Sequence, residues 1–164
     1  MGSWVVSEQV VPQPVIRRAS AHELPRLVEL LQQESLGGEQ REDPGPPLSR
    51  RYRDAFAAIE VDPDNAIFVA ELDGHVVGMF QRTFIRHLQR GGERVSEIES
   101  VVVDEPFRGR GIGAAMMRWA IDEARAAGCT RVQLTSNVAR KHAHRFYERL
   151  GFVAGYVGMK LALT

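Results

Sequence analysis

The chain has 164 residues, a length that suits one domain with two layers packed around a single core. Its 21 Lys and Arg residues balance 21 Asp and Glu residues, which excludes a general electrostatic attraction to nucleic acid or to an anionic membrane. One cysteine, Cys129, excludes an internal disulfide, and no CxxC or Cys/His cluster predicts a metal site. Because no apolar run is long enough for a membrane span and no signal-peptide pattern is present, we expect a soluble, cytoplasmic protein.

The sequence begins with a predicted tail followed by a short strand. Residues 1–14 mix apolar and polar types without a sustained period, so the predicted single domain covers residues 15–164. Val15 and Ile16 begin the strand.

Two helices are predicted next, separated by a long loop. Ser20 followed by Glu23 is typical of a helix start, and apolar residues then repeat at helical spacing up to about Leu36. Residues 37–49 are rich in Pro and Gly and predict a surface loop, which either covers a substrate cleft or simply connects the helices. The second helix is predicted around residues 52–59.

In the middle of the chain, the spacing of apolar residues changes from that of a helix to that of extended strands. Residues 66–72 and 75–85 flank the two-residue turn Asp73-Gly74, which predicts a β-hairpin. A further strand is predicted at residues 95–103, where the sequence ends in three valines.

The last part of the chain predicts helices alternating with strands. An apolar stripe indicates a helix from residue 112 to about 124, and Gly128 stops it. A short strand at 132–135, a helix at 139–150 and a final hairpin at 152–163 follow. The strand-helix-strand unit predicts two parallel strands joined by a right-handed crossover. We therefore predict an α/β (α+β) fold.

Three glycines occur within five residues where the strand 95–103 gives way to the next helix, in the run Arg108-Gly109-Arg110-Gly111-Ile112-Gly113. Glycines let the backbone approach a ligand closely, and free N–H groups at a helix N-terminus favour an anion such as pyrophosphate. The two arginines can add charge-assisted hydrogen bonds. A tight corner without a ligand would also explain the glycines.

The same glycines fit a dinucleotide-binding fingerprint, but the rest of the sequence argues against that class of protein. The fingerprint requires an acidic residue about 20 residues further on, at the end of the next strand. That place is occupied by Leu134-Thr135-Ser136-Asn137. A P-loop is excluded as well, because no Gly-Lys-Ser/Thr follows the glycines.

Two motifs resemble those of the GNAT family of N-acetyltransferases. The first is Arg-x-x-Gly-x-Gly, formed by Arg108, Gly111 and Gly113 after the three valines. The second begins at Ser136-Asn137 and continues through Arg140, the run Ala143-His144-Arg145-Phe146-Tyr147 and Leu150-Gly151-Phe152. Within the family, these motifs look most like those of aminoalkylphosphonate N-acetyltransferases.

This resemblance implies a fold, a cosubstrate and a set of cofactor contacts. The implied fold is a mixed, mostly antiparallel sheet of six to seven strands with a central parallel pair, flanked by about four helices. Acetyl-CoA would place its pyrophosphate on the glycine loop and its pantetheine arm along the three valines. Asn137 could instead act as a helix N-cap. The implied contacts are Val101, Val102, Val103, Arg108, Gly109, Arg110, Gly111, Ile112, Gly113, Ala114, Asn137, Arg140 and His144.

Acetylation of an amine needs a base, a donor for the oxyanion and a proton for the leaving thiolate. The strand period of two predicts that Glu97 and Glu99 share a face with Val101 and Val103. The resemblance places Glu97, ahead of Glu99, at the position of the base, although both could be solvated carboxylates. It places Tyr147 at the position of the general acid, although packing would also explain this residue.

The sequence says least about the amine that would accept the acetyl group. The resemblance implies direct attack by a primary amine of a small molecule in a ternary complex. A protein or peptide acetyltransferase acting on lysine or an N-terminus, and a non-catalytic CoA-binding sensor, remain alternatives. The final hairpin could support a homodimer. Four arginines on the predicted arm could receive an acidic amine or could be solvated, namely Arg82, Arg86, Arg90 and Arg94.

Overall fold

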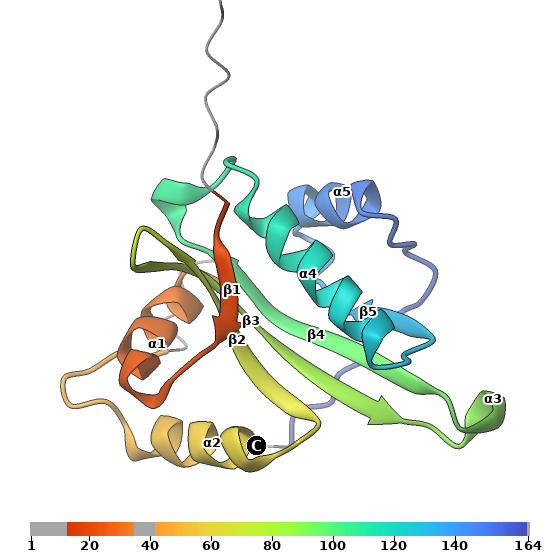
Figure 1. Cartoon of the computed structure of the whole chain (residues 1–164), viewed down its shortest axis with the longest axis horizontal. Helices are drawn as coiled ribbons and strands as arrows, with labels where there is room; N and C mark the ends of the chain where they lie inside the picture. Colours follow the sequence, from red (N-terminus) through yellow and green to blue (C-terminus); the bar gives the residue numbers. More distant parts are fainter. Residues whose placement is uncertain (1–12, 35–41, 164) are drawn as a thin grey trace, which may run out of the picture.

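The computed structural model describes residues 13–34 and 42–163, which form one mixed sheet with helices packed against it (Figure 1). The predicted tail up to residue 12 and residues 37–41 of the predicted loop lie outside the described residues. In chain order the elements are β1 (Val15–Arg18), the short 3₁₀ helix η1 (Ala21–Glu23), α1 (Leu24–Gln32), α2 (Arg50–Val61), β2 (Asn65–Leu72), β3 (His75–Arg86), α3 (Gln89–Gly92), β4 (Arg94–Val103), the 3₁₀ helix η2 (Glu105–Phe107), α4 (Ile112–Ala126), β5 (Arg131–Leu134) and α5 (Lys141–Arg149).

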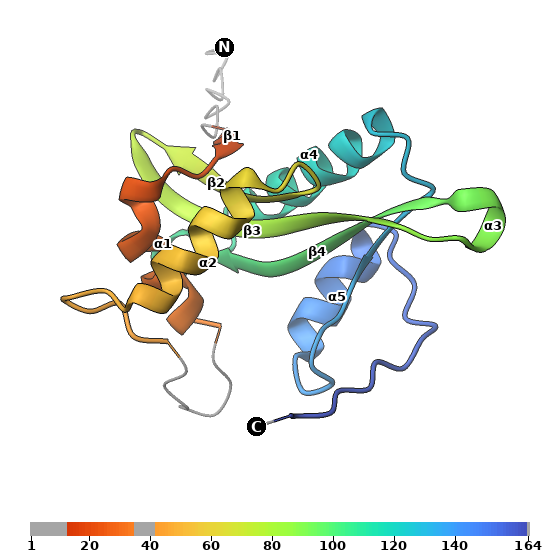
Figure 2. The ribbon, with the colours of Figure 1, turned by 90° about the horizontal axis from the view of Figure 1, so that it is seen from below.

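The five described strands lie in the order β1-β2-β3-β4-β5. The pairs β1/β2, β2/β3 and β3/β4 are antiparallel, and β5 is parallel to β4, which it pairs from Val95 opposite Arg131 to Ile98 opposite Leu134. The predicted hairpin and the predicted parallel pair are therefore confirmed. The hairpin of β3 and β4 projects from the body, with α3 at its tip (Figure 2).

Each face of the sheet carries its own apolar cluster. The amphipathic pattern of α4 buries one stripe on the first face, where Ile112, Met116, Met117 and Ala120 meet Phe68, Phe80 and Ile98. On the second face α1 and α2 contribute Leu24, Leu27, Val28, Leu30 and Phe56, which pack with Val69, Met79 and Val102. The predicted helices are confirmed, except that α1 ends at Gln32 rather than near Leu36. None of the helices in the described residues is long and apolar enough to cross a membrane.

A β-bulge interrupts β4 at Ser100, whose backbone is left-handed with φ of 53°. The register between β3 and β4 shifts beside it. The extra residue reverses the alternation of side chains beyond the bulge. Val101 and Val103 consequently join Ile98 on the face of α4, whereas Val102 packs on the face of α1.

The bulge corrects the predicted placement of the two strand glutamates. Glu97 and Glu99 flank Ile98, so both lie on the face opposite to it. The prediction that they share a face with Val101 and Val103 is wrong, because an uninterrupted period of two was assumed across Ser100. The carboxylates instead lie on the face that carries α1 and α2.

The prediction of a final hairpin at residues 152–163 is also wrong. This segment contains no strand, and most of its side chains are exposed. A strand is stabilised by hydrogen bonds to a neighbour, which a favourable sequence pattern does not by itself provide. The described sheet therefore has five strands rather than the six or seven expected.

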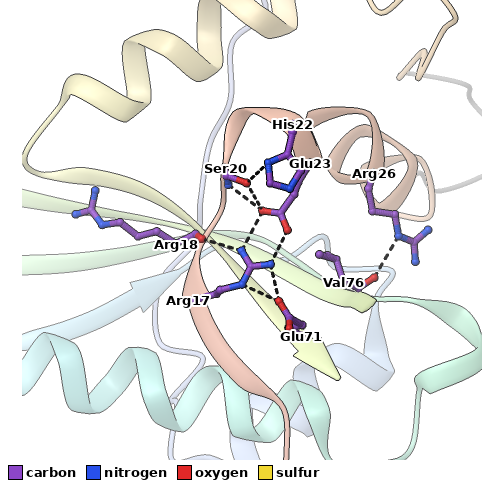
Figure 3. Close-up of polar contacts among 8 residues, drawn as sticks. All are labelled: Arg17, Arg18, Ser20, His22, Glu23, Arg26, Glu71 and Val76. Atoms are coloured by element: carbon purple, nitrogen blue, oxygen red, sulfur yellow. Dashed lines mark hydrogen bonds and ion pairs between the residues drawn. The ribbon is translucent and has the colours of Figure 1, made fainter. Parts of the chain in front are cut away.

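The start of the domain is held by a partly buried ion cluster around the buried Glu23 (Figure 3). The guanidinium of Arg17 on β1 donates to both Glu23 oxygens, at 2.6 and 3.0 Å, and to Glu71 on β2 at 2.6 and 2.8 Å. The N–H of Ser20 donates to Glu23 at 2.8 Å, which confirms the predicted helix start. The hydrogen bonds from Arg17 lower the pKa of Glu23 to about 2, although burial acts in the opposite direction. One arginine therefore ties the first strand, the second strand and the first helix together.

We expect Glu23→Gln to lower the free energy of unfolding at pH 7 by on the order of 2 kcal/mol. The Glu23 carboxyl titrates near 2 in the folded protein, against 4.5 as its ordinary value. Its contribution is present above about pH 4.5 and is lost as the pH falls toward 2. Urea titrations from pH 7 to pH 2 should therefore show a smaller acid-induced loss of stability in the variant. Glu29→Gln, on the exposed side of α1, is the control and should follow the parent; equal losses in parent and Glu23→Gln would contradict the assignment.

Candidate functional site

The glycine loop between β4 and α4 presents an uncovered run of backbone. Gly109 and Gly111 have φ of 76° and 82°, a left-handed conformation that favours glycine. A Cβ atom added at either position would meet no atom within 4 Å, so the loop faces open space. Within the described residues, no acceptor receives the N–H groups from Gly109 to Ala114. These donors and the N-terminus of the 15-residue α4 form a suitable cradle for a phosphate group.

The two arginines of the loop have different surroundings. Arg108 turns back onto the protein, where its Nε donates to the Val103 carbonyl at 2.9 Å and its Nη2 to Gln33 Oε1 at 3.2 Å. Arg110 is exposed, with its guanidinium 5.2 Å from the centre of the Phe107 ring. Arg108 thus shapes the loop, and Arg110 is the arginine that can reach an anion.

Gln33, just after α1, binds the residues at which the loop begins. Sequence reasoning did not identify it. Its amide nitrogen donates to Asp104 at 2.8 Å, and its amide oxygen accepts the Glu105 N–H at 3.0 Å. Asp104 also pairs with Arg26 of α1. Burial acts to raise the pKa of Asp104, but these hydrogen bonds lower it overall. A glutamine at the end of an amphipathic helix gives no sequence signal, because its role depends on the loop that the fold brings to it.

The parallel strands β4 and β5 separate beyond Ile98 and Leu134 (Figure 2). From Glu99 to Val103, β4 continues with no described strand on that side. Apart from the Val103 carbonyl, which accepts from Arg108, its outward backbone groups there are available to a ligand that lies like an added strand. The free edge leads directly to the glycine loop.

The motif residues between β5 and α5 bind one another. Asn137 Oδ1 accepts the Ala139 N–H at 2.9 Å, and the Asn137 carbonyl lies 2.9 Å from His144 Nε2. Asn137 therefore forms a turn and is not the N-cap of α5, a position taken by Arg140. The guanidinium of Arg140 pairs with Glu34 at 3.3 Å and also donates to the Glu34 carbonyl. Arg140 thus links the start of α5 to the end of α1.

Tyr147 lies beside this contact, in the middle of an aromatic group on α5. Its ring centre is 5.1 Å from that of Phe146 and 5.8 Å from that of Phe152. Burial raises the pKa of Tyr147 to about 12, and Glu34 adds to the shift while Arg140 opposes it. Phe146 in turn faces Gly113, where an added Cβ would lie 3.5 Å from its ring. The Phe146 ring therefore brings the two motifs together at Gly113, and the neighbouring Tyr147 packs against the same apolar cluster with its hydroxyl protonated.

The two strand glutamates differ in their surroundings. Gln133 of β5 donates to Glu97 at 2.8 Å, and Glu97 is half-buried. Glu99 is exposed, and its charge is among those that act on Glu34. Glu97 is therefore the better ordered carboxylate, whereas Glu99 is the more accessible one.

The basic arm predicted from four arginines is only partly present. Arg82 is buried, with 5% of its surface exposed and its guanidinium 3.7 Å from the centre of the Phe84 ring. Arg94 pairs with Asp64. Arg86 and Arg90 are exposed but lie toward the tip of the hairpin, at the opposite end of β4 from the glycine loop. The hypothesis that this arm receives an acidic substrate is therefore not supported by the geometry.

Comparison with known proteins agrees with this arrangement. The model of the Acetyltransferase (GNAT) family matches residues 25–152. The chain belongs to this family. It is 38% identical over 112 residues to an aminoalkylphosphonate N-acetyltransferase of Salmonella typhimurium, covering 68% of this chain and 72% of that protein. It is 36% identical over 97 residues to a glucosamine 6-phosphate N-acetyltransferase of Trypanosoma brucei brucei, covering 59% and 64%.

A solved structure shows the same fold over nearly the whole chain. A transcriptional regulator from Bacillus halodurans C-125 superposes with a TM-score of 0.87 at 37% identity, covering 92% of this chain and all of that one. The GNAT protein described here is thus an acetyltransferase with the mixed α+β fold that its motifs predict.

Gly111→Ala should weaken acetyl-CoA binding about 10-fold, because a Cβ disfavours the left-handed backbone that aims the loop N–H groups. Isothermal titration calorimetry measures the effect. Gly91→Ala is the matched control: Gly91 has φ of 76°, an added Cβ there also meets no atom within 4 Å, and it lies in the distant hairpin tip. Both variants should lose similar stability, and only Gly111→Ala should lose affinity. Equal affinities in the two variants would contradict the cradle.

Proposed function

We propose that the protein transfers the acetyl group of acetyl-CoA to a primary amine of a small molecule, by direct attack in a ternary complex. The proposal rests on one observation: two sets of unpaired backbone groups lie next to each other. The free N–H groups from Gly109 to Ala114 continue into the edge of β4 from Glu99 to Val103, which has no neighbouring strand among the described residues and of which the Val103 carbonyl is bound by Arg108. A ligand with a pyrophosphate at one end and an amide-containing arm at the other matches both sets.

The bound cosubstrate would contact residues from both motifs. Its pyrophosphate would accept from the loop N–H groups and from Arg110, whose exposed guanidinium lies over the Phe107 ring. Its pantetheine amides would pair with the backbone of Val101, Val102 and Val103. The turn at Asn137 and the Arg140–Glu34 contact would lie on the other side of the bound cosubstrate.

The reaction needs a neutral amine, because an ammonium nitrogen has no free electron pair. Glu97 or Glu99 would accept the proton, directly or through a water, on the face where α1 and α2 lie. The amine nitrogen then bonds to the thioester carbon while the carbonyl oxygen becomes an oxyanion, and the nitrogen releases its second proton to solvent. A backbone N–H of the Val101 to Val103 run would hold this oxyanion until the carbon–sulfur bond breaks.

Tyr147 would stabilise the leaving thiolate. Its pKa of about 12 keeps the hydroxyl protonated at every physiological pH. A thiol has a pKa near 8.5, so a complete proton transfer from this tyrosine to the thiolate is uphill. The raised pKa therefore favours donation of a hydrogen bond to the sulfur, with the final proton supplied by solvent.

The two named relatives act on an aminoalkylphosphonate and on glucosamine 6-phosphate. Both are small primary amines with a phosphorus oxyanion, and this class of compound is the acceptor we propose. A CoA-release assay should show turnover with such amines and none with lysine peptides. Turnover with peptides alone would favour a protein acetyltransferase. Tight acetyl-CoA binding without turnover on any amine would favour a sensor.

Tyr147→Phe should lower kcat about 100-fold and leave the acetyl-CoA Kd unchanged, because it removes the hydroxyl and retains the ring packing. Steady-state kinetics and calorimetry separate the two quantities. Tyr156→Phe, at a tyrosine that is 94% exposed, is the control and should match the parent. A kcat equal to that of the parent would exclude a role for the Tyr147 hydroxyl in the reaction.

Glu97→Gln should lower kcat/KM most at acidic and neutral pH, where the amine is an ammonium ion that must lose its proton. At alkaline pH the amine is neutral in solution, so the variant should approach the parent. Rate profiles from pH 6 to pH 10 test this. The same profile produced by Glu99→Gln alone would assign the base to Glu99 instead.

A further inference from the structure

Four buried side-chain polar atoms in the described residues lack a hydrogen-bond partner, and all four belong to the arm formed by β3, β4 and their connection. They are Arg82 Nε, His87 Nε2, Arg94 Nε and Ser96 Oγ. A polar atom buried without a partner costs free energy, so each such atom needs an explanation. All four atoms can donate a hydrogen bond, and an arginine Nε can only donate. The partner that would satisfy them is therefore an acceptor.

Three of these side chains lie on the same face of the sheet as α4. Arg82 is opposite Ile98, which packs under α4, and Ser96 and Arg94 precede Ile98 on β4 at intervals of two residues. The helix ends beside them, where the Ala127 carbonyl accepts from Arg94 at 3.3 Å. Figure 1 shows the arm extending past this end of α4. The unpartnered donors therefore gather at the C-terminal end of α4.

Two aromatic rings hold three arginines together at this place. The guanidinium of Arg82 lies 3.7 Å from the centre of the Phe84 ring, and that of Arg94 lies 4.2 Å from the same centre. Arg82 and Arg18 in turn lie 5.3 and 6.0 Å from the centre of the Phe68 ring. A ring that covers the face of a guanidinium leaves the N–H groups at its edge available to an acceptor.

The charges of this cluster are not balanced within the described residues. Arg82 is 95% buried, at 5% exposure, and forms no ion pair there. Burial and then the charge of Arg18 lower the pKa of Arg82, and Arg94 adds to the shift, while Glu123 opposes it. Asp64 is already paired with Arg94. A buried cation without a paired anion is strongly disfavoured, so the cluster favours a negatively charged ligand.

We propose that Arg18, Arg82 and Arg94 bind a phosphate oxyanion at the C-terminal end of α4. Arg18 is exposed and the Arg94 side chain is 22% exposed, so the cluster opens to solvent on one side. Phosphate offers several acceptor oxygens and up to two negative charges at neutral pH, which suits several guanidinium groups. The 15 residues of α4 place this site about 22 Å from the glycine loop. It also lies on the face opposite to Glu97, so it is separate from the proposed reaction.

Thermal unfolding in phosphate, with the ionic strength held constant by chloride, tests the proposal. At about ten times its dissociation constant, phosphate should raise the Tm by about 3 to 6 °C. Arg82→Met should remove most of this rise, and Arg51→Met, at an exposed arginine of α2, is the control that should keep it. The rise is measured within each chain, so a change in a variant's own stability does not affect it. No rise in the parent, or an equal rise in Arg82→Met, would overturn the proposal.

Free phosphate and the phosphate group of an organic molecule share the chemistry that this cluster would recognise. The same measurement with glycerol 3-phosphate distinguishes them. A rise with both compounds assigns the site to a phosphate ester as well as to free phosphate, and a rise with inorganic phosphate alone assigns it to the free ion.

Cys129, the one cysteine of the chain, reports on the site without any substitution. Burial raises the pKa of Cys129, and the charges of Arg94 and Arg82 oppose the shift. These charges should attract the anionic reagent iodoacetate more than neutral iodoacetamide. Phosphate should therefore slow alkylation by iodoacetate at least about 3-fold, and alkylation by iodoacetamide less, relative to chloride at equal ionic strength. Phosphate bound only at the glycine loop lies too far away to do this, so an unchanged iodoacetate rate contradicts the proposed position.

Discussion

The separation of β4 from β5 beyond Ile98 and Leu134 leaves a stretch of backbone from Glu99 to Val103 without a strand on one side. Buried backbone donors and acceptors need partners, and we propose that a ligand supplies them here. The same separation makes room for α5 to approach α4, which brings Phe146 against Gly113. The glycine loop, the free edge and Tyr147 lie together because these two strands part.

The end of α1 supports this site from the other face. Gln33 binds both Asp104 and the start of η2, and the neighbouring Glu34 binds Arg140 of α5. Two consecutive residues thus connect α1 to both motif-bearing segments.

The bulge at Ser100 shows where a sequence pattern stops being sufficient. Alternation correctly placed Glu97 and Glu99 on one face, but it could not reveal the inserted residue that turns Val101 and Val103 to the other. A bulge is set by the pairing of β4 with β3, which no single strand specifies. The same limit applies to Arg82, a charged residue whose burial over Phe84 depends on three-dimensional packing.

The sequence by itself determined the α/β class, the main helices and strands, the parallel pair and the GNAT family, because periodicity, turn residues and the two motifs are local. It identified the glycine loop for the same reason. Only the tertiary structure decided that Arg108 shapes the loop, that Asn137 forms a turn and that Gln33 and Glu34 contact the two motif-bearing segments. It also decided that residues 152–163 find no strand partner in one chain. Each of these depends on contacts between residues far apart in the sequence, which local patterns do not encode.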